Sequence, residues 1–382
     1  MKKILYFYSV ASPFAYLGIK RLIEISTPDK GGPAQFASAF SSWLTKKGVA
    51  TSIISLTDNA TSHTNSDFLT IDLISRKSGI ASRMLKTSNL IRKKSSSSKL
   101  LINGLFLETL LASFTKRIDY IAKIPGDIVW ERARNTGSTN LDIDEFQGNE
   151  PIQLRAMRWA FTKSLKRARQ IISPSLHLVK LMSGWGIDES KVVVIPNGVD
   201  TETFKPDINA EKIYDLITVS RLVEWKGIKE LIEAADQLAC RLLIVGSGPQ
   251  ESELRQLAAK SKGIVEFAGE IEQSQLPKLI NSSRFFVLNS KYEGSPHSLI
   301  EAMSCGALVI ARASTGTKEL IESGVDGVLV VDHEKLENVL KSCISDQKTR
   351  LNMGVKAREK ILRNYSREKI FSDIYRLTVQ NK

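Results

Sequence analysis

The chain has 382 residues, of which 42% are hydrophobic and 25% charged, so it is long enough and apolar enough for two α/β domains that each bury a core. Its formal net charge of +13 favours an anionic partner, such as phosphate, nucleic acid or an acidic membrane surface, without bearing on the fold. The spacing of its three cysteines excludes a cysteine metal site and a disulfide framework, and fits a reducing compartment.

The first apolar run extends from Ile4 to Ile19 and follows two lysines. Pro13 interrupts this run, and the run is too short to span a bilayer comfortably. We therefore predict a first strand, or an extension packed on the domain or against lipid, in preference to a cleaved secretory signal. No later stretch of the sequence is apolar for long enough to span a bilayer.

From Arg21 onward, strand and helix patterns alternate along the chain. The sequence predicts a helix at residues 34–46 and strands at residues 22–26, 50–56, 100–102, 120–124 and 170–173. Alternation of this kind indicates a parallel sheet covered by helices.

A second series of elements begins after Pro206. The predicted strands lie at residues 214–219, 241–245, 265–267, 285–288, 308–311 and 327–331, and the predicted helices at residues 226–239, 250–259, 298–305 and 334–345. Because Pro196, Gly198 and Pro206 punctuate the chain between the two series, we predict a first domain at residues 1–205 and a second at residues 206–365. We expect a C-terminal helix at residues 366–382 to pack back on the first domain.

The most informative segment is a glycine- and proline-containing turn that follows the predicted strand 285–288 and leads into a helix beginning near Ser298. Backbone N–H groups at a helix N-terminus suit phosphate oxygens. Glu293 on the turn and Glu301, predicted in the first helical turn, could accept hydrogen bonds from ribose and sugar hydroxyls. The structural alternative is that Ser298 is an N-cap and that the glutamates lie on a solvated loop.

Two cations, Arg221 and Lys226, follow the predicted strand 214–219 and precede a helix. Ligands of open α/β sheets bind at the carboxyl ends of strands. Two fixed cations there would neutralise a diphosphate leaving group. The alternative is a pair of ordinary surface cations. The glycine turn at residues 246–249 follows another strand, and we interpret it mainly as a turn.

Together these segments resemble the family-4 retaining glycosyltransferases of the GT-B fold, over nearly the whole chain from about residue 21. The family signature E-G-x-P-x-x-x-x-E-A is matched at residues 293–302 and R-L-x-x-x-K-G at residues 221–227. The interdomain P-N-G-V-D segment is matched at residues 196–200. The resemblance implies an α/β architecture of two Rossmann-like domains that face each other across a donor-binding cleft.

The resemblance also implies roles for individual residues. Glu293, Arg221 and Lys226 would act in catalysis, the last two by binding the donor diphosphate. The donor-binding set implied by the match is Gly31, Gly32, Arg221, Lys226, Gly269, Ile271, Glu293, Gly294, Ser295, Pro296, Ser298, Leu299 and Glu301.

One position departs from the family pattern. Many relatives place a histidine of the catalytic cleft after a middle strand of the first domain, and the corresponding segment here is residues 123–127. Asp127 would then stand where that histidine does, and we predict that it hydrogen-bonds the sugar or the acceptor. Its structural alternative is a turn or helix cap.

The implied reaction is transfer of a hexosyl-type sugar from a nucleotide-diphosphate sugar, with retention of anomeric configuration and no required metal. The acceptor would be a glycan or a lipid-linked molecule in cell-surface polysaccharide or glycolipid synthesis. The sequence leaves open the sugar, the acceptor and the nucleotide, whether UDP, GDP or ADP. The alternatives are a catalytically silent GT-B scaffold protein and another GT-B-type enzyme, such as a nucleotide-sugar epimerase or a phosphorylase.

Basic side chains interleave with apolar ones at residues 76–99, and a second basic run occupies residues 155–169. Such segments can lie on an anionic membrane. We predict a cytoplasmic protein. Peripheral association with the inner face of the membrane stays open, and its alternative is that these segments form a solvated basic face. No nucleic-acid partner is predicted, because no nucleic-acid-binding module accompanies the charge.

Overall fold

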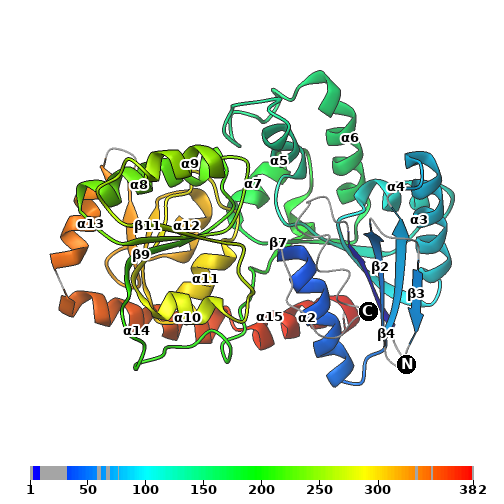
Figure 1. Ribbon diagram of the computed structural model, residues 1–382. Coiled ribbons are helices and arrows are strands. Elements are labelled where there is room, and N and C mark those ends of the chain that lie inside the picture. The colour runs from blue at the N-terminus through cyan, green and yellow to red at the C-terminus, as the bar shows by residue number, and fades with distance from the viewer. Residues whose placement is uncertain are drawn as a thin grey trace. The chain divides into compact units, whose positions relative to one another are not determined.

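The computed structural model describes residues 3–8, 32–57, 62–65, 69–75, 77–331, 334–345 and 347–380. The chain divides into two units, Met1–Ile195 with Phe371–Lys382, and Pro196–Ile370 (Figure 1). Residues 196–205, expected in the first domain, belong to the second unit. The reason is local packing, because Val199 accepts from and donates to the backbone of residues 365–367 and Phe204 lies in the second unit's core.

The first unit is built on an eight-stranded sheet with the order β3-β4-β2-β1-β5-β6-β7-β8, in which only the β3–β4 pair is antiparallel. Its strands are β1 (Lys3–Tyr8), β2 (Thr51–Thr57), β3 (Ser62–Asn65), β4 (Leu69–Ser75), β5 (Ser98–Asn103), β6 (Tyr120–Lys123), β7 (Gln170–Ser173) and β8 (Val192–Val194). Residues 3–8 of the apolar N-terminus thus form a strand between β2 and β5, one of the two predicted forms, and residues 9–19 lie outside the described residues. The strand predicted at residues 22–26 lies outside the described residues.

The helices of the first unit are α2 (Gly32–Lys46), α3 (Ile80–Lys94), α4 (Phe106–Thr115), α5 (Ile128–Asn135), α6 (Ile152–Arg167) and α7 (Leu176–Gly184), with a 3-10 turn η1 (Glu189–Lys191). The chain returns to this unit at Phe371, within the C-terminal α15 (Arg367–Tyr375), and continues into η3 (Arg376–Gln380). Its Phe371 ring lies 5.1 Å from Phe40 and 5.5 Å from Phe36 of α2. Helices α3, α4 and α6 lie side by side (Figure 1).

The second unit contains a six-stranded parallel sheet with the order β11-β10-β9-β12-β13-β14. Its strands are β9 (Tyr214–Val219), β10 (Leu242–Val245), β11 (Val265–Gly269), β12 (Ser283–Leu288), β13 (Leu308–Arg312) and β14 (Val328–Val330). Its helices are α8 (Ile228–Gln237), α9 (Glu251–Ala258), α10 (Leu276–Asn281), α11 (His297–Ser304), α12 (Thr315–Leu320), α13 (Leu336–Ser345) and α14 (Gln347–Asn364), with a 3-10 turn η2 (Glu224–Lys226).

Apolar side chains from both faces of this sheet are buried. Ile217 and Phe286 belong to one core cluster, whereas the preceding residues Leu216 and Phe285 belong to the other. Because successive side chains of a strand point to opposite faces, a strand covered on both sides needs a continuous apolar run. This requirement explains why the six strands of this sheet were predictable.

None of the described helices is both long enough and apolar enough to cross a membrane.

Candidate functional site

The candidate site lies at the carboxyl ends of β9 and β12. These strands are neighbours in the second sheet, with Leu216 opposite Phe285 and Ile217 opposite Phe286. From β9 the chain proceeds to β10 and β11 on one side, and then returns to place β12 on the other side. Open α/β sheets bind ligands outside the strand ends at such a reversal. The loops after β9 and β12, which carry the predicted residues, therefore meet where a ligand is expected.

These two loops are joined by close backbone packing. Gly227 has φ of +61°, and a Cβ there would lie 2.5 Å from the Asn289 carbonyl oxygen. Asn289 Nδ2 donates to the Gly227 carbonyl at 2.9 Å, and Lys291 N donates to the Trp225 carbonyl at 2.8 Å. Only glycine fits both the backbone conformation and the space. The loop after β9 is thereby fixed against the loop after β12.

The structure brings together two residues that the sequence assigned to different parts of the donor. Lys226 Nζ lies 2.5 Å from Glu293 Oε1, and both side chains are largely buried. Arg221 lies on the same loop, with its guanidinium carbon 5.6 Å from the centre of the Trp225 ring. Within the described ranges no carboxylate pairs with Arg221. Among the residues that the structure describes, none therefore neutralises its charge.

The glycine turn after β10 supports the Arg221 loop. A Cβ on Gly246 would lie 1.9 Å from the Ser220 carbonyl oxygen, and one on Gly248 would lie 2.3 Å from that of Leu222. Leu222 N donates to the Ser247 carbonyl at 2.9 Å. The turn interpretation of residues 246–249 agrees with this geometry. The contact also shows why both glycines are needed.

The helix that follows Glu293 begins one residue before Ser298, near which the sequence predicts its start. α11 starts at His297, and its N-cap residue is Pro296, which makes no side-chain capping hydrogen bond. Ser298 is therefore inside the first turn and is not the N-cap. Glu301 lies in the second turn, and the prediction that placed it in the first turn is wrong. The first-turn backbone N–H groups have no side-chain cap, which suits an anionic ligand.

Glu301 is only 8% exposed. Burial raises the pKa of Glu301 to about 7, although a hydrogen bond from Gln273 and the charge of Arg367 act in the opposite direction. Gln273 Nε2 lies 3.0 Å from Glu301 Oε1. Sequence reasoning did not single out Gln273, because it comes from the loop after β11 and meets Glu301 only in the folded sheet.

Two further residues hold the loop of Glu293. Asn197 Nδ2 donates to the Ser295 carbonyl at 2.9 Å. Gly316 N donates to the Glu293 carbonyl at 2.9 Å, and a Cβ on Gly316 would lie 2.4 Å from that oxygen. Asn197 belongs to the P-N-G-V-D segment recognised in the sequence. Gly316 was missed, and a glycine just after the end of β13 was the only available signal.

Gly269 and Ile271 lie at the end of β11. Gly269 has φ of +64° and accepts a hydrogen bond from Gly246 N at 2.7 Å. Ile271 is partly buried against the core. The positive φ favours glycine at this position. Contact between this segment and a nucleotide base stays a prediction.

The residues predicted in the first unit are less fully described. Gly31 lies outside the described residues, and Gly32 is the first residue of α2. Asp127 has no exposed surface and caps α5, because its Oδ1 accepts from Val129 N at 3.0 Å and from Trp130 N at 3.3 Å.

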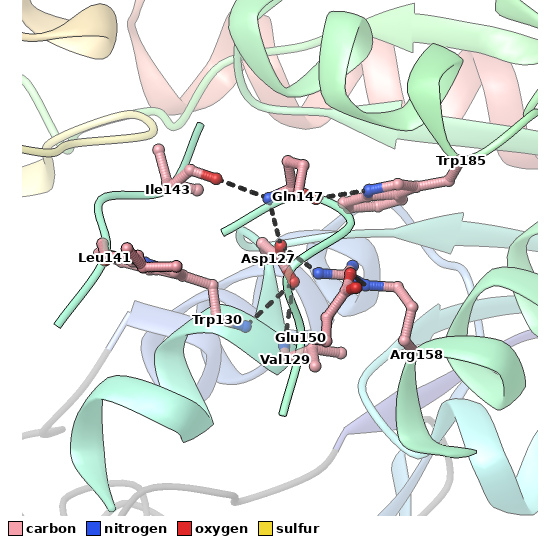
Figure 2. Close-up of polar contacts among 9 residues, drawn as sticks. All are labelled: Asp127, Val129, Trp130, Leu141, Ile143, Gln147, Glu150, Arg158 and Trp185. Carbon is pink, nitrogen blue, oxygen red and sulfur yellow. Dashed lines mark hydrogen bonds and ion pairs between the residues drawn. The ribbon is translucent and has the colours of Figure 1, made fainter. Parts of the chain in front are cut away.

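The second oxygen of Asp127 is also occupied (Figure 2). It accepts from Gln147 Nε2 at 3.1 Å and from Arg158 Nη2 at 2.6 Å. Gln147 in turn accepts from Trp185 Nε1 at 2.8 Å, and Arg158 Nε donates to Glu150 at 2.9 Å. These contacts support the structural alternative, a helix cap within a buried ion-pair network. Direct contact with a substrate stays a prediction.

Within the described ranges, no three histidine, cysteine, aspartate or glutamate side chains are grouped so that they could hold a metal ion. The metal independence implied by the family resemblance stays a prediction.

Comparison with known proteins locates this site in a recognised region. Residues 200–360 match the family model described as Glycosyl transferases group 1, and residues 143–203 match that of Glycosyltransferase Family 4. A Campylobacter jejuni protein, N,N'-diacetylbacillosaminyl-diphospho-undecaprenol alpha-1,3-N-acetylgalactosaminyltransferase, is 26% identical over 52% of this chain and 57% of its own length. The chain spans about half the length of the curated relatives it matches.

Solved structures are similar over the whole chain. Sucrose-phosphate synthase from Thermosynechococcus elongatus has a TM-score of 0.77 at 18% identity, covering 100% of this chain and 99% of its own. Anabaena HepE in complex with UDP-glucose has a TM-score of 0.73 at 19% identity, covering 100% of both chains. At these identities the likeness shows the fold alone. It confirms the predicted α/β architecture of two Rossmann-like domains.

Proposed function

We propose that the chain is a glycosyltransferase, because residues 200–360 match the Glycosyl transferases group 1 family model and the fold is of the GT-B type. It transfers a hexosyl-type sugar from a nucleotide-diphosphate sugar to a glycan or lipid-linked acceptor, in polysaccharide or glycolipid synthesis. The observation that carries the proposal is the pairing of Lys226 with Glu293 beside Arg221, at the strand-order reversal of the second unit.

The electrostatic demand of the reaction is to stabilise the leaving diphosphate. Arg221 offers a charge that no carboxylate of the described ranges pairs with, and the first-turn N–H groups of α11 add partial positive charge. Lys226 is held by Glu293 and can exchange this partner for a phosphate oxygen when the donor binds. Glu293 is then free to accept hydrogen bonds from hydroxyls of the sugar.

We propose that the reaction retains the anomeric configuration. The bond from the anomeric carbon to the diphosphate oxygen breaks, and its electron pair leaves with the diphosphate. The acceptor oxygen bonds to the anomeric carbon on the same face, and the acceptor proton passes to the leaving diphosphate. No protein base is required in this scheme, which agrees with the engagement of Asp127 in its own network.

We propose that Glu301 binds the ribose of the donor. An ionised carboxylate accepts hydrogen bonds from both hydroxyls of a ribose, and Gln273 orients the Glu301 side chain. Backbone groups of Gly269 and Ile271 supply contacts to the base. The nucleotide is UDP, GDP or ADP.

A thermal-shift panel of UDP-, GDP- and ADP-glucose tests the donor site. A ligand that binds the native state raises the melting temperature by mass action. We expect one nucleotide class to stabilise the wild type, and we expect Lys226→Met and Glu301→Ala to lose this effect. Lys318→Met removes an exposed lysine from α12 and is the matched control. We expect this variant to keep the stabilisation by the nucleotide. Equal stabilisation of all four proteins would contradict the site.

The stereochemical part has a separate test. The first product released during turnover is examined by NMR, with added EDTA in a parallel sample. An α-linked product from an α-linked donor, formed equally with EDTA, supports retention without a metal. If no nucleotide sugar binds at all, the scaffold alternative replaces the enzyme.

We also propose that the acceptor is held near an anionic membrane. Apolar side chains are exposed on the three adjacent helices α3, α4 and α6, among them Leu85, Phe114 and Trp159. α3 and α6 each carry five basic residues and no acidic residue. We call the exposed faces of these three helices the basic helix surface. Basic and apolar groups together favour the interface of an anionic bilayer.

A further inference from the structure

A row of buried polar side chains follows the carboxyl edge of the first unit's sheet. The strand register aligns Ser55 of β2 and Asn103 of β5 with the same residue of β1, and Lys123 of β6 follows the aligned pair Ile102 and Ala122. Ser55, Asn103 and Lys123 are 0%, 2% and 4% exposed. Aligned residues of neighbouring parallel strands project from the same face, so the three side chains share one face of the sheet.

This row crosses the strand-order reversal of the first unit. From β1 the chain proceeds to β2 and β4 on one side, and β5 and β6 follow on the other. Ligands of open α/β sheets bind at the carboxyl end of such a reversal. The polar row thus lies where a ligand of the first unit is expected.

Lys123 is the charged member of the row. Its Nζ lies 4.6 Å from the centre of the Phe36 ring of α2, and within the described ranges no carboxylate pairs with it. Two acidic residues lie four positions from Lys123: Asp127 is engaged by Arg158 and Gln147, and Asp119 pairs with Lys99 and Arg169. Burial lowers the pKa of Lys123 to about 8. A buried ammonium group without a counter-charge is costly, and structural packing alone does not require it.

Helix α2 supplies the aromatic ring that Lys123 contacts. It spans Gly32–Lys46, and its first turn contains no acidic residue. Phe36 is the fifth residue of the helix, so the ring that Lys123 Nζ contacts belongs to its second turn. The positive end of a helix dipole favours an anion, as a buried ammonium group does.

We propose that Lys123 binds a phosphate group of a substrate held at the carboxyl edge of the first unit's sheet. This inference rests on the proposed function, in which two substrates can carry phosphate: the nucleotide sugar and a phosphorylated acceptor. Asn103 lies at the corresponding position of the neighbouring strand β5. Lys123 is a binding residue additional to Arg221 and Lys226 of the second unit.

Calorimetric titration of the full chain with UDP and with inorganic pyrophosphate tests the inference. Lys123→Met removes the charge and keeps the side-chain length. Lys123→Gln keeps a hydrogen-bond donor and guards against a packing defect specific to methionine. Lys47→Met is the matched control, because Lys47 also lies over an aromatic ring, 5.3 Å from the centre of Trp43, but is exposed. Lys226→Met reports on the donor site of the second unit.

We expect both Lys123 variants to bind a phosphate ligand at least tenfold more weakly, and the Lys47 variant to bind within twofold of the wild type. A loss in the UDP titration identifies the donor as the source of the phosphate. An unchanged UDP titration, with loss of pyrophosphate binding to the UDP-saturated protein, identifies the acceptor.

The inference is overturned if both Lys123 variants bind both ligands as the wild type does. In that case, weaker UDP binding by Lys226→Met shows that the proposed function holds although the phosphate site at Lys123 does not exist. Conversely, pyrophosphate binding that depends on Lys123 in a protein that does not bind UDP supports the phosphate site and removes the proposed function.

Discussion

Glu301 couples the donor site to pH at the scale of a single residue. Burial raises its pKa from 4.5 to about 7, so the folded protein holds this proton more tightly than the unfolded chain does. The stability that results is fully present below about pH 4.5 and is lost as the pH rises through about 7. Above pH 7 the Glu301 carboxyl group is ionised in the folded protein, and the free energy of unfolding is lowered by the whole cost of burying this charge.

The variant Glu301→Gln keeps the shape and the acceptor oxygen for Gln273 but cannot ionise. We expect its free energy of unfolding, relative to wild type, to increase between pH 5 and pH 8 by up to about 3 kcal/mol. Urea unfolding at both pH values measures this difference. Glu359→Gln, at an exposed position of α14, is the control. A difference between Glu301→Gln and wild type that is the same at both pH values would show that the carboxyl group is not the source.

Asp127 is the residue at which a catalytic and a structural role can be separated. Replacement by asparagine leaves Arg158 with Glu150 as its remaining carboxylate partner. Breaking a buried ion pair costs about 3–5 kcal/mol of stability. Because Glu150 still pairs with Arg158, we expect a loss near the lower end, about 3 kcal/mol. The variant Arg158→Met removes the other side of the pair.

A double-mutant cycle of Asp127→Asn and Arg158→Met, followed by urea unfolding, measures the coupling. If the two residues act as a structural pair, the double variant loses clearly less stability than the sum of the single variants. A strictly additive result, together with loss of turnover only in Asp127→Asn, would favour the catalytic prediction instead.

At the scale of elements, buried parallel strands were the most predictable part of the fold. β12 is covered on both faces, and its residues 285–288 form a continuous apolar run that the sequence displays directly. The start of α11 was less predictable, since serine is a common N-cap whereas Pro296 holds this position here with extended backbone angles. Local sequence patterns indicate which residue types are common N-caps, but they do not show which of several adjacent residues takes that position.

The candidate site was predictable in its residue types but not in its contacts. Lys226 and Glu293 were recognised on separate loops, and only the adjacency of β9 and β12 brings them together. Gln273 and Gly316 reach the site from two other loops. A single sequence does not determine strand order, so it does not reveal such partners.

The packing of α12 against the Glu293 loop predicts that alanine at Gly316 lowers the stability, although helix propensity alone predicts an increase. Alanine is a better helix former than glycine, so Gly316→Ala in the first turn of α12 would stabilise an isolated helix. Its Cβ would lie 2.4 Å from the Glu293 carbonyl oxygen, and the loop must move to relieve that contact. We expect a loss of about 2 kcal/mol in stability, typical of overpacking, and at least tenfold weaker donor binding.

Thermal unfolding and donor titration of Gly316→Ala measure these two effects. Gly79→Ala is the control, because a Cβ at Gly79 meets no atom within 4 Å. A Gly316→Ala protein that is more stable than wild type and binds donor normally would show that the contact does not position Glu293.

At the scale of the whole molecule, the excess positive charge predicts where the protein works. Lys94 of α3 and Arg158 of α6 are paired with carboxylates, so they contribute little to the net field of the basic helix surface. The other basic side chains of these helices include Arg83, Lys86, Lys93, Arg155, Lys163, Lys166 and Arg167. Each basic side chain near an anionic bilayer contributes about 1 kcal/mol of attraction.

We therefore expect the protein to float with vesicles that contain anionic phosphatidylglycerol, and to remain in solution with vesicles of phosphatidylcholine alone. Raising the salt to molar concentration should release it, because ionic screening at that strength acts over about 3 Å.

Trp159→Ser should weaken binding, since this exposed side chain on α6 would enter the interface. Ile208→Ser removes an apolar side chain that is 94% exposed in the second unit, and this control should bind as the wild type does. If both variants weaken binding equally, general hydrophobicity explains the association. If neither vesicle type binds, the surface is a solvated basic face and the acceptor reaches the site from solution.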